Sequence, residues 1–137
     1  WPVHIEQNLD ESVLQFVEQS LYLRPLGPRG PEYDVLQNTH ITPQGAKALA
    51  DATTDCWQAI LKKDVRAFGE TVRRSFDAQI AIFPNMVNDR VRDLIAQYEN
   101  QALGWKLSGA GGGGYLILVS DKPIDRGVRI QVRRELE

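Results

Sequence analysis

The sequence has few of the residues that mark a disulfide-rich, metal-binding or strongly charged protein. Its 137 residues include one cysteine, Cys56, and two histidines, His4 and His40. A single cysteine can form neither an internal disulfide nor a cysteine-based zinc site, and we expect no metal site of the chain's own. The net charge is −2. A dedicated nucleic-acid-binding protein needs a concentrated basic surface, so nucleic acid is not an expected partner.

Long hydrophobic segments are also absent. No apolar run approaches the ~20 residues that cross a membrane, and no signal-peptide pattern is present. We therefore expect no membrane partner and a reduced, cytoplasmic location. The 42% of hydrophobic and 25% of charged residues fit one domain spanning residues 1–137. The chain begins with Trp1-Pro2 rather than Met, and we expect further residues to precede it in the encoded protein.

The hydrophobic periodicity predicts alternating strands and helices. Helices are expected after the N-caps Asn8 or Asp10, Thr42 and Asp64, and over residues 87–102. Strands are expected over residues 3–6, 21–24, 105–108, 115–119 and 128–133. This order predicts an α+β fold with helices packed on one face of a mainly antiparallel sheet. Residues 115–119 are apolar on both faces, which predicts an interior strand covered on both sides.

Two further segments stand out from this pattern. Residues 26–41 show no clear periodicity, and a long stretch of this kind inside a compact domain is usually functional or mobile. Residues 109–114 contain five glycines and formally match the dinucleotide-binding motif GxGxxG. That motif requires a helix after the glycines, whereas a strand follows here. A Walker A loop is excluded as well, because Tyr115 stands where lysine is required.

The glycine run needs more explanation than a hairpin turn gives. A plain hairpin uses one or two glycines, and each further glycine adds to the entropy lost on ordering. The run is typical of bare backbone that approaches a ligand or a second loop and offers N–H groups to an anion. Lys106 and Ser108 share one strand face beside it. A purely structural loop and a solvated lysine remain the alternatives.

Residues 106–114, Lys-Leu-Ser-Gly-Ala-Gly-Gly-Gly-Gly, resemble the C-terminal motif of the GHMP kinases. The mevalonate-, heptose- and fucose-type members are the most similar. The upstream helices and Gly104-Trp105 also look like the C-terminal domain of that family, and Phe83-Pro84 with Asn88 resembles a Ser-Pro…Asn stretch of its heptose-phosphate kinases. The resemblance extends from Thr42 onward and more loosely from Val3.

The resemblance implies a ferredoxin-like domain whose glycine loop helps to shape a phosphate and substrate site. The whole enzyme would transfer the γ-phosphoryl group of ATP, with Mg²⁺, to a small-molecule hydroxyl, here of a sugar or sugar phosphate. The cofactor-binding residues it implies are Ser108, Gly109, Ala110, Gly111, Gly112, Gly113 and Gly114. Lys106 is expected to contact the substrate, and His40 either contacts a sugar or packs in its loop.

The chain also departs from the family pattern. It has no Pro-x-x-Gly-Leu-Gly-Ser-Ser phosphate loop, so no catalytic residue is assigned, and ATP and Mg²⁺ are expected to bind through an N-terminal domain missing from this chain. Ala78 and Gln79 stand where heptose kinases tend to carry lysine, which leaves the sugar-phosphate specificity open. The alternatives are a non-catalytic ligand-binding or regulatory domain of the same fold, and a plain interaction domain.

Overall fold

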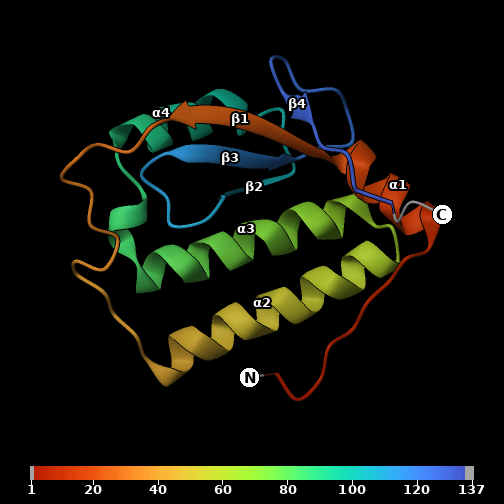
Figure 1. Ribbon diagram of the computed structural model, residues 1–137, viewed down its shortest axis with the longest axis horizontal. Coiled ribbons are helices and arrows are strands. Elements are labelled where there is room, and N and C mark those ends of the chain that lie inside the picture. Colours follow the sequence, from red (N-terminus) through yellow and green to blue (C-terminus); the bar gives the residue numbers. More distant parts are fainter. Residues whose placement is uncertain (1, 135–137) are drawn as a thin grey trace.

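The computed structural model describes residues 2–134, which form an α+β domain with a four-stranded antiparallel sheet. Figure 1 shows its elements in chain order. The helices are α1 (Glu11–Ser20), α2 (Pro43–Leu61), α3 (Val65–Ile82) and α4 (Asp89–Tyr98), with a short 3-10 turn at Pro84–Met86. The strands are β1 (Leu21–Gly27), β2 (Gly104–Leu107), β3 (Gly114–Val119) and β4 (Val128–Arg129).

The strands lie in the order β2-β3-β1-β4, with each neighbouring pair antiparallel. β3 is therefore inserted between β1 and β2, which makes the split βαβ arrangement of the ferredoxin-like fold. The long helices α2 and α3 form an antiparallel hairpin along the β2 side of the sheet (Figure 1). The predicted α+β fold class is confirmed.

The helix N-termini follow the capping signals in the sequence. The Asp10, Thr42 and Asp64 side chains each accept a hydrogen bond from a backbone N–H group in the first turn of the helix that follows. Asn88 does the same for α4, which is shorter at both ends than predicted. Gly104, which follows this helix closely in the sequence, begins β2.

The Asp64 cap gives a direct test of helix α3. Its carboxylate accepts hydrogen bonds from the N–H groups of Arg66 and Ala67, at 3.1 and 3.0 Å. We expect Asp64→Ala to lower the free energy of unfolding by about 1 kcal/mol, because two N–H groups lose their acceptor. Urea unfolding measures the change. Asp77→Ala, at an exposed position within the same helix, is the control and should leave stability unchanged or slightly higher.

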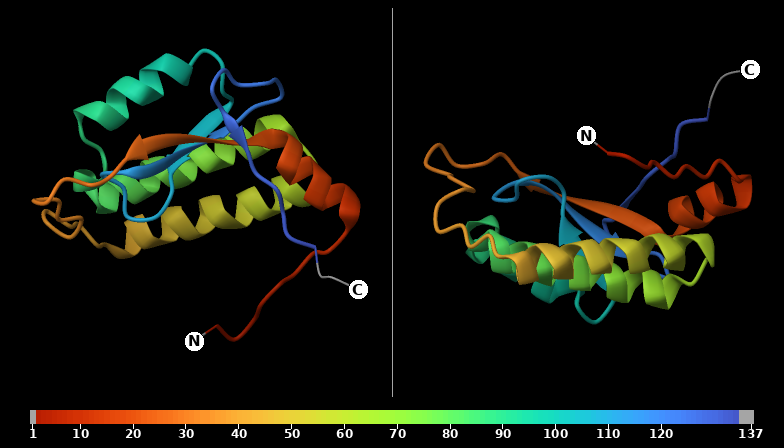
Figure 2. Two further views of the ribbon diagram at one scale, coloured as in Figure 1. Left: turned by 45° about the horizontal axis from the view of Figure 1, so that its top comes forward. Right: turned by 90° about the horizontal axis from the view of Figure 1, so that it is seen from below.

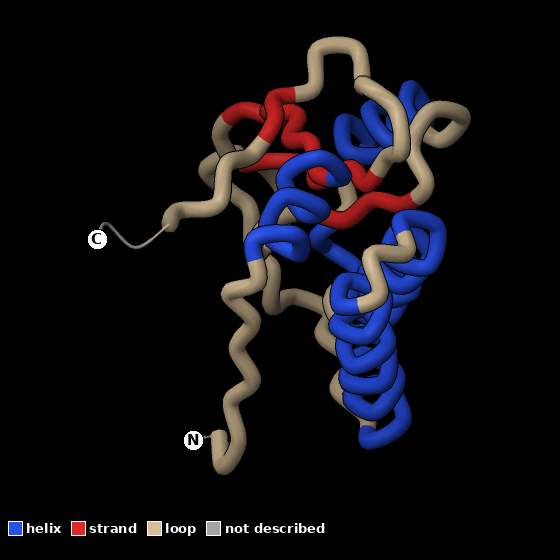
Figure 3. Tube along the Cα trace, turned by 90° about the vertical axis from the view of Figure 1, so that its right-hand side faces the viewer, coloured by secondary structure: helices blue, strands red, loops and turns tan. Residues whose placement is uncertain are grey.

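The two faces of the sheet are covered to different degrees. Tyr22, Trp105 and Leu118 lie opposite one another across the strands and pack with Val91 and Tyr98 of α4 in the larger core cluster. On the other face, Val119 joins Phe68 and Val72 of α3 in a second cluster. Figures 2 and 3 show α4 on one side of the sheet and the two terminal segments on the other.

The predicted cover on both sides of β3 holds only in part. β3 lies inside the sheet, and Leu116, Leu118 and Val119 are fully buried. On the second face, however, Ile117 is only half-buried and Tyr115 is 47% exposed. The helical hairpin reaches this face at its Val119 end and leaves the end next to the glycine loop open.

Three predicted strands differ from the observed structure. Residues 3–6 form no strand, because no sheet edge lies beside them, and Val3 and Ile5 are exposed. β1 continues past Pro25 to Gly27, because β4 pairs only with Tyr22 and Leu23 and the missing proline N–H costs no ladder bond on that side. β4 is limited to Val128 and Arg129, which pair with Leu23 and Tyr22 near the start of β1, so the residues that follow run past this start toward α1, where the Val132 N–H donates to the Glu18 carboxylate.

Candidate functional site

The glycine loop connects β2 to β3 in a conformation that ordinary residues rarely adopt. The backbone φ angles are +70° at Gly109, +77° at Gly111, +67° at Gly112 and +83° at Gly114. These values lie in the left-handed region, where glycine has no Cβ atom to clash with the backbone. The run of glycines therefore follows from the shape of the loop itself.

A segment from the irregular stretch after β1 lies against the loop. The Arg29 side chain donates a hydrogen bond from Nε to the Gly111 carbonyl at 2.8 Å, and the Tyr33 hydroxyl donates to the Ala110 carbonyl. The Arg29 guanidinium lies 5.8 Å from the centre of the Tyr33 ring, within cation–π range. Sequence reasoning missed both residues, because no periodicity or motif marks them within residues 26–41.

The 3-10 turn after α3 holds the loop from another side. The Gly112 N–H donates to the Met86 carbonyl at 3.1 Å. A Cβ atom added at Gly111 would lie 2.7 Å from that same carbonyl oxygen, and one at Gly112 would lie 2.4 Å from the Tyr33 ring. The loop is therefore packed between two segments of its own chain, and its glycines permit this close approach.

Several backbone N–H groups of the loop have no partner among the residues that the structure describes. Within residues 2–134, no hydrogen bond is found from the N–H groups of Gly109, Ala110, Gly111 or Gly113. Successive N–H groups in a loop with alternating helical handedness form concave anion-binding sites. The loop lies next to a shallow cavity of about 420 Å³, lined by Gly27, Arg29, Gly114 and Tyr115 among others. The loop can therefore offer the N–H groups of the exposed Gly109 and the half-buried Ala110 to an anion, whereas Gly111 and Gly113 are buried.

Ser108 and Lys106 precede the loop but take different positions. Ser108 is exposed, and its N–H donates to the Tyr115 carbonyl at 2.9 Å, which closes the base of the loop. Lys106 lines another cavity, between the helical hairpin and the sheet, that no loop glycine lines. Burial lowers the pKa of its ammonium group.

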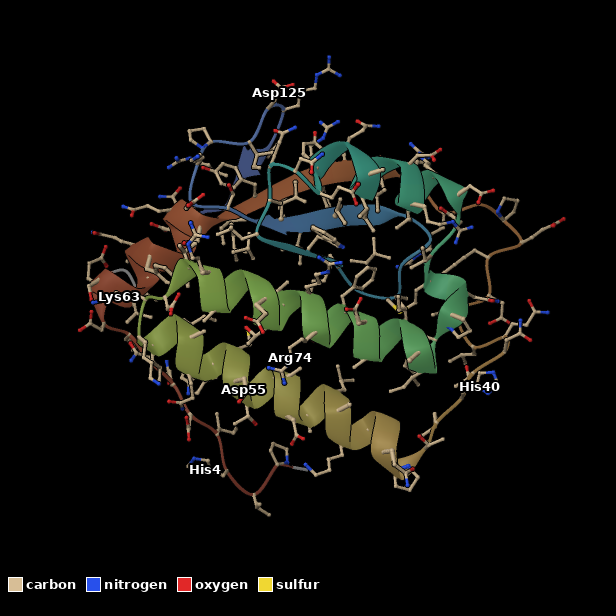
Figure 4. The ribbon with its side chains drawn as sticks, turned by 180° about the vertical axis from the view of Figure 1, so that it is seen from behind. His4, His40, Asp55, Lys63, Arg74 and Asp125 are labelled. Carbon is tan, nitrogen blue, oxygen red and sulfur yellow. The ribbon has the colours of Figure 1, made fainter. Side chains whose placement is uncertain are left out.

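His40 lies at the far end of the irregular segment, just before α2, where its side chain is exposed (Figure 4). Its backbone N–H donates to the Ile82 carbonyl at 2.8 Å, which ties the segment to the end of α3. Neither the cavity beside the loop nor that of Lys106 includes His40. Of the two cavities described within residues 2–134, neither is lined by His40, Lys106 and the loop glycines together.

In the part of the chain from 2 to 134, no three histidine, cysteine or carboxylate side chains lie together as metal ligands. The helices described there include none long and apolar enough to span a membrane. Burial raises the pKa of the Cys56 thiol, so the neutral thiol is favoured.

The fold and the glycine loop together define a ferredoxin-like α+β domain with a glycine-rich β2–β3 connection. Residues 57–136, more than half of the chain, match the family described as GHMP kinases C terminal. The chain belongs to this family. Comparison with curated proteins gave no match.

A solved structure supports the same fold. The chain is similar to a D-glycero-D-manno-heptose 1-phosphate kinase from Bacteriodes thetaiotaomicron, with a TM-score of 0.54 and 15% sequence identity. The alignment covers 84% of this chain and 29% of the heptose kinase chain. This chain therefore spans less than a third of the length of that enzyme.

Proposed function

We propose that this chain is the C-terminal part of an ATP-dependent kinase that phosphorylates a small-molecule hydroxyl, in particular that of a sugar or sugar phosphate. Membership of the GHMP kinase family supports the kinase class. The sugar-phosphate substrate is suggested by the heptose kinase neighbour and by the motif at residues 106–114.

The proposal rests on the loop, where the N–H groups of Gly109, Ala110, Gly111 and Gly113 have no hydrogen-bond partner within residues 2–134. Catalysis of phosphoryl transfer depends almost entirely on positioning and on electrostatic stabilisation of the transferred group. The contacts from Arg29, Tyr33 and Met86 fix the loop, so its N–H groups are oriented before a phosphate arrives. A preorganised donor set of this kind costs little reorganisation during the reaction.

The remaining parts of the active site are assigned to a preceding domain. The proposal places the ATP phosphate loop, Mg²⁺ and the catalytic residue in an N-terminal domain, and Ser108 through Gly114 opposite them. The 29% coverage of the heptose kinase chain supports a larger protein. We still predict that Lys106 and His40 contact the substrate. The cytoplasmic location also stays a prediction.

A second candidate function is favoured by the same internal packing. Because Tyr33 and Arg29 already contact the loop, close packing within this chain gives an independent reason for its glycines. A non-catalytic ligand-binding or regulatory domain of the GHMP fold would retain this arrangement without phosphoryl transfer.

An activity comparison separates the two candidates. We expect the full-length encoded protein to consume ATP with at least one member of a panel of sugars and sugar phosphates. The isolated 137-residue chain should transfer no phosphate, because one side of a cleft cannot position the γ-phosphoryl group. Coupled detection of ADP measures both reactions.

The encoded sequence gives an independent check. The residues that precede Trp1 should contain a Pro-x-x-Gly-Leu-Gly-Ser-Ser segment that opens a helix. An open reading frame that starts at or near Trp1, or a full-length protein inactive across the panel, would favour the binding domain. Transfer by the isolated chain would refute the proposed division of the active site.

A further inference from the structure

A second cavity lies between the helical hairpin and the sheet and shares no lining residue with the glycine loop. Its volume is about 270 Å³. It is lined mainly by Cys56, Trp57 and Ile60 of α2, Val72 and Ser75 of α3, and Lys106 of β2. This volume lies just below the range of roughly 300–1,000 Å³ that suits drug-sized ligands, so a single ring is an appropriate size.

The walls of this cavity are mostly apolar, and their polar groups are largely occupied. The Trp57 indole N–H donates to the Glu6 carboxylate. The Thr53 hydroxyl at the rim donates to the Leu49 carbonyl at 2.9 Å. Burial keeps the Cys56 thiol in its neutral form by raising its pKa. These groups leave little capacity for binding a polar ligand.

Lys106 is the exception among the lining groups. Within residues 2–134 its ammonium group has no hydrogen-bond or ion-pair partner, and no carboxylate lines the cavity. The Ser75 hydroxyl from α3 likewise has no partner among the described residues and is available as a donor. A half-buried cation without a counter-charge is costly, since burial disfavours the charged form. An anion beside it would remove this cost.

The number of donors decides between the possible anions. One ammonium and one hydroxyl match the single charge and two oxygens of a carboxylate. A phosphate group carries up to two charges and needs more donors, which the apolar walls do not provide. We propose that this cavity binds a small monocarboxylate with an apolar body, held by Lys106 and Ser75 and packed against Trp57 and Val72.

The test uses the 137-residue chain, whose two core clusters are formed from its own residues. Benzoate is the probe, with benzamide as a neutral analogue of the same shape and inorganic phosphate as a second anion. Two-dimensional NMR follows the backbone amides during each titration. We expect benzoate at up to about 10 mM to shift amides of α2, α3 and β2 around the cavity, corresponding to a millimolar dissociation constant.

The variants separate the charge from the shape of the cavity. Lys106→Met keeps the length of the side chain and should weaken benzoate binding by at least about tenfold. Ser75→Ala should weaken it by a smaller factor, because it removes only one hydroxyl donor. The control Lys122→Met removes an exposed lysine outside the cavity and should bind as the wild type does. The amide spectra also report whether each variant is folded.

The proposal fails if benzoate causes no shifts around the cavity, or if it binds the Lys106→Met variant with unchanged affinity. Equal binding of benzamide would overturn it too, because the Lys106 ammonium would then not distinguish a charged carboxylate from a neutral amide. Stronger binding of phosphate than of benzoate would replace the monocarboxylate with another anion. Shifts confined to the glycine loop would assign the anion to that loop instead.

Discussion

Replacement of Gly112 by valine is expected to lower phosphoryl transfer by the full-length protein by at least about 100-fold, while the domain stays folded. The new side chain would meet the Tyr33 ring at 2.4 Å and would have to adopt a φ of +67°. Tyr33 can swing away, but the loop then loses the contacts that position its N–H groups. We expect kcat to fall, as measured by coupled detection of ADP.

Gly30→Val is the matched control for this variant. Gly30 lies in the segment that approaches the loop, and a Cβ atom there would have nothing within 4 Å. The control should retain wild-type activity, and thermal unfolding should show both variants folded. If the folded Gly112→Val variant keeps the wild-type kcat, the loop has no part in the proposed mechanism.

The second large effect concerns stability. Gly104→Val is expected to lower the free energy of unfolding by more than about 3 kcal/mol. A Cβ atom at Gly104 would lie 1.9 Å from the Gly69 carbonyl oxygen of helix α3. Because both partners are backbone atoms, no side-chain rotation relieves the clash, and α3 has to move away from β2. Urea unfolding followed by circular dichroism measures the loss.

The reciprocal variant tests the same contact from the helix. Gly69→Ala would place its Cβ atom 2.6 Å from Leu103 Cβ, and we expect it to destabilise the domain in the same direction. Gly30→Ala, in open space, should unfold at the wild-type urea concentration. An unchanged midpoint for Gly104→Val would contradict the tight contact between α3 and β2.

The regular elements with strong local signals were predictable from the sequence. Thr42 and Asp64 cap α2 and α3 as expected, because capping depends on a side-chain oxygen and N–H groups only two or three residues away. The strand signal at residues 3–6 was equally clear but misleading. Alternating polarity describes a strand only where a sheet edge is available, and that depends on residues distant in sequence.

In the candidate site, too, the local features were predictable from the sequence and the long-range contacts were not. The position of the glycine loop, and its resemblance to the GHMP kinases, were evident from residues 106–114 alone. Arg29 and Tyr33 were not predictable, because they contact the loop across about 80 residues of sequence without forming a motif of their own. The placement of Lys106 depends on the packing of α2 and α3 against the sheet, which no local pattern encodes.

The low cysteine content and the hydrophobic periodicity of the sequence already carried two conclusions about the fold. The single cysteine was enough to exclude an internal disulfide, and the hydrophobic periodicity was enough to predict an α+β order of elements. The segments that surround the glycine loop, and the separate cavity that Lys106 faces, became evident from the folded domain alone. Composition and periodicity report local preferences, whereas a site is assembled by contacts between residues far apart in the chain.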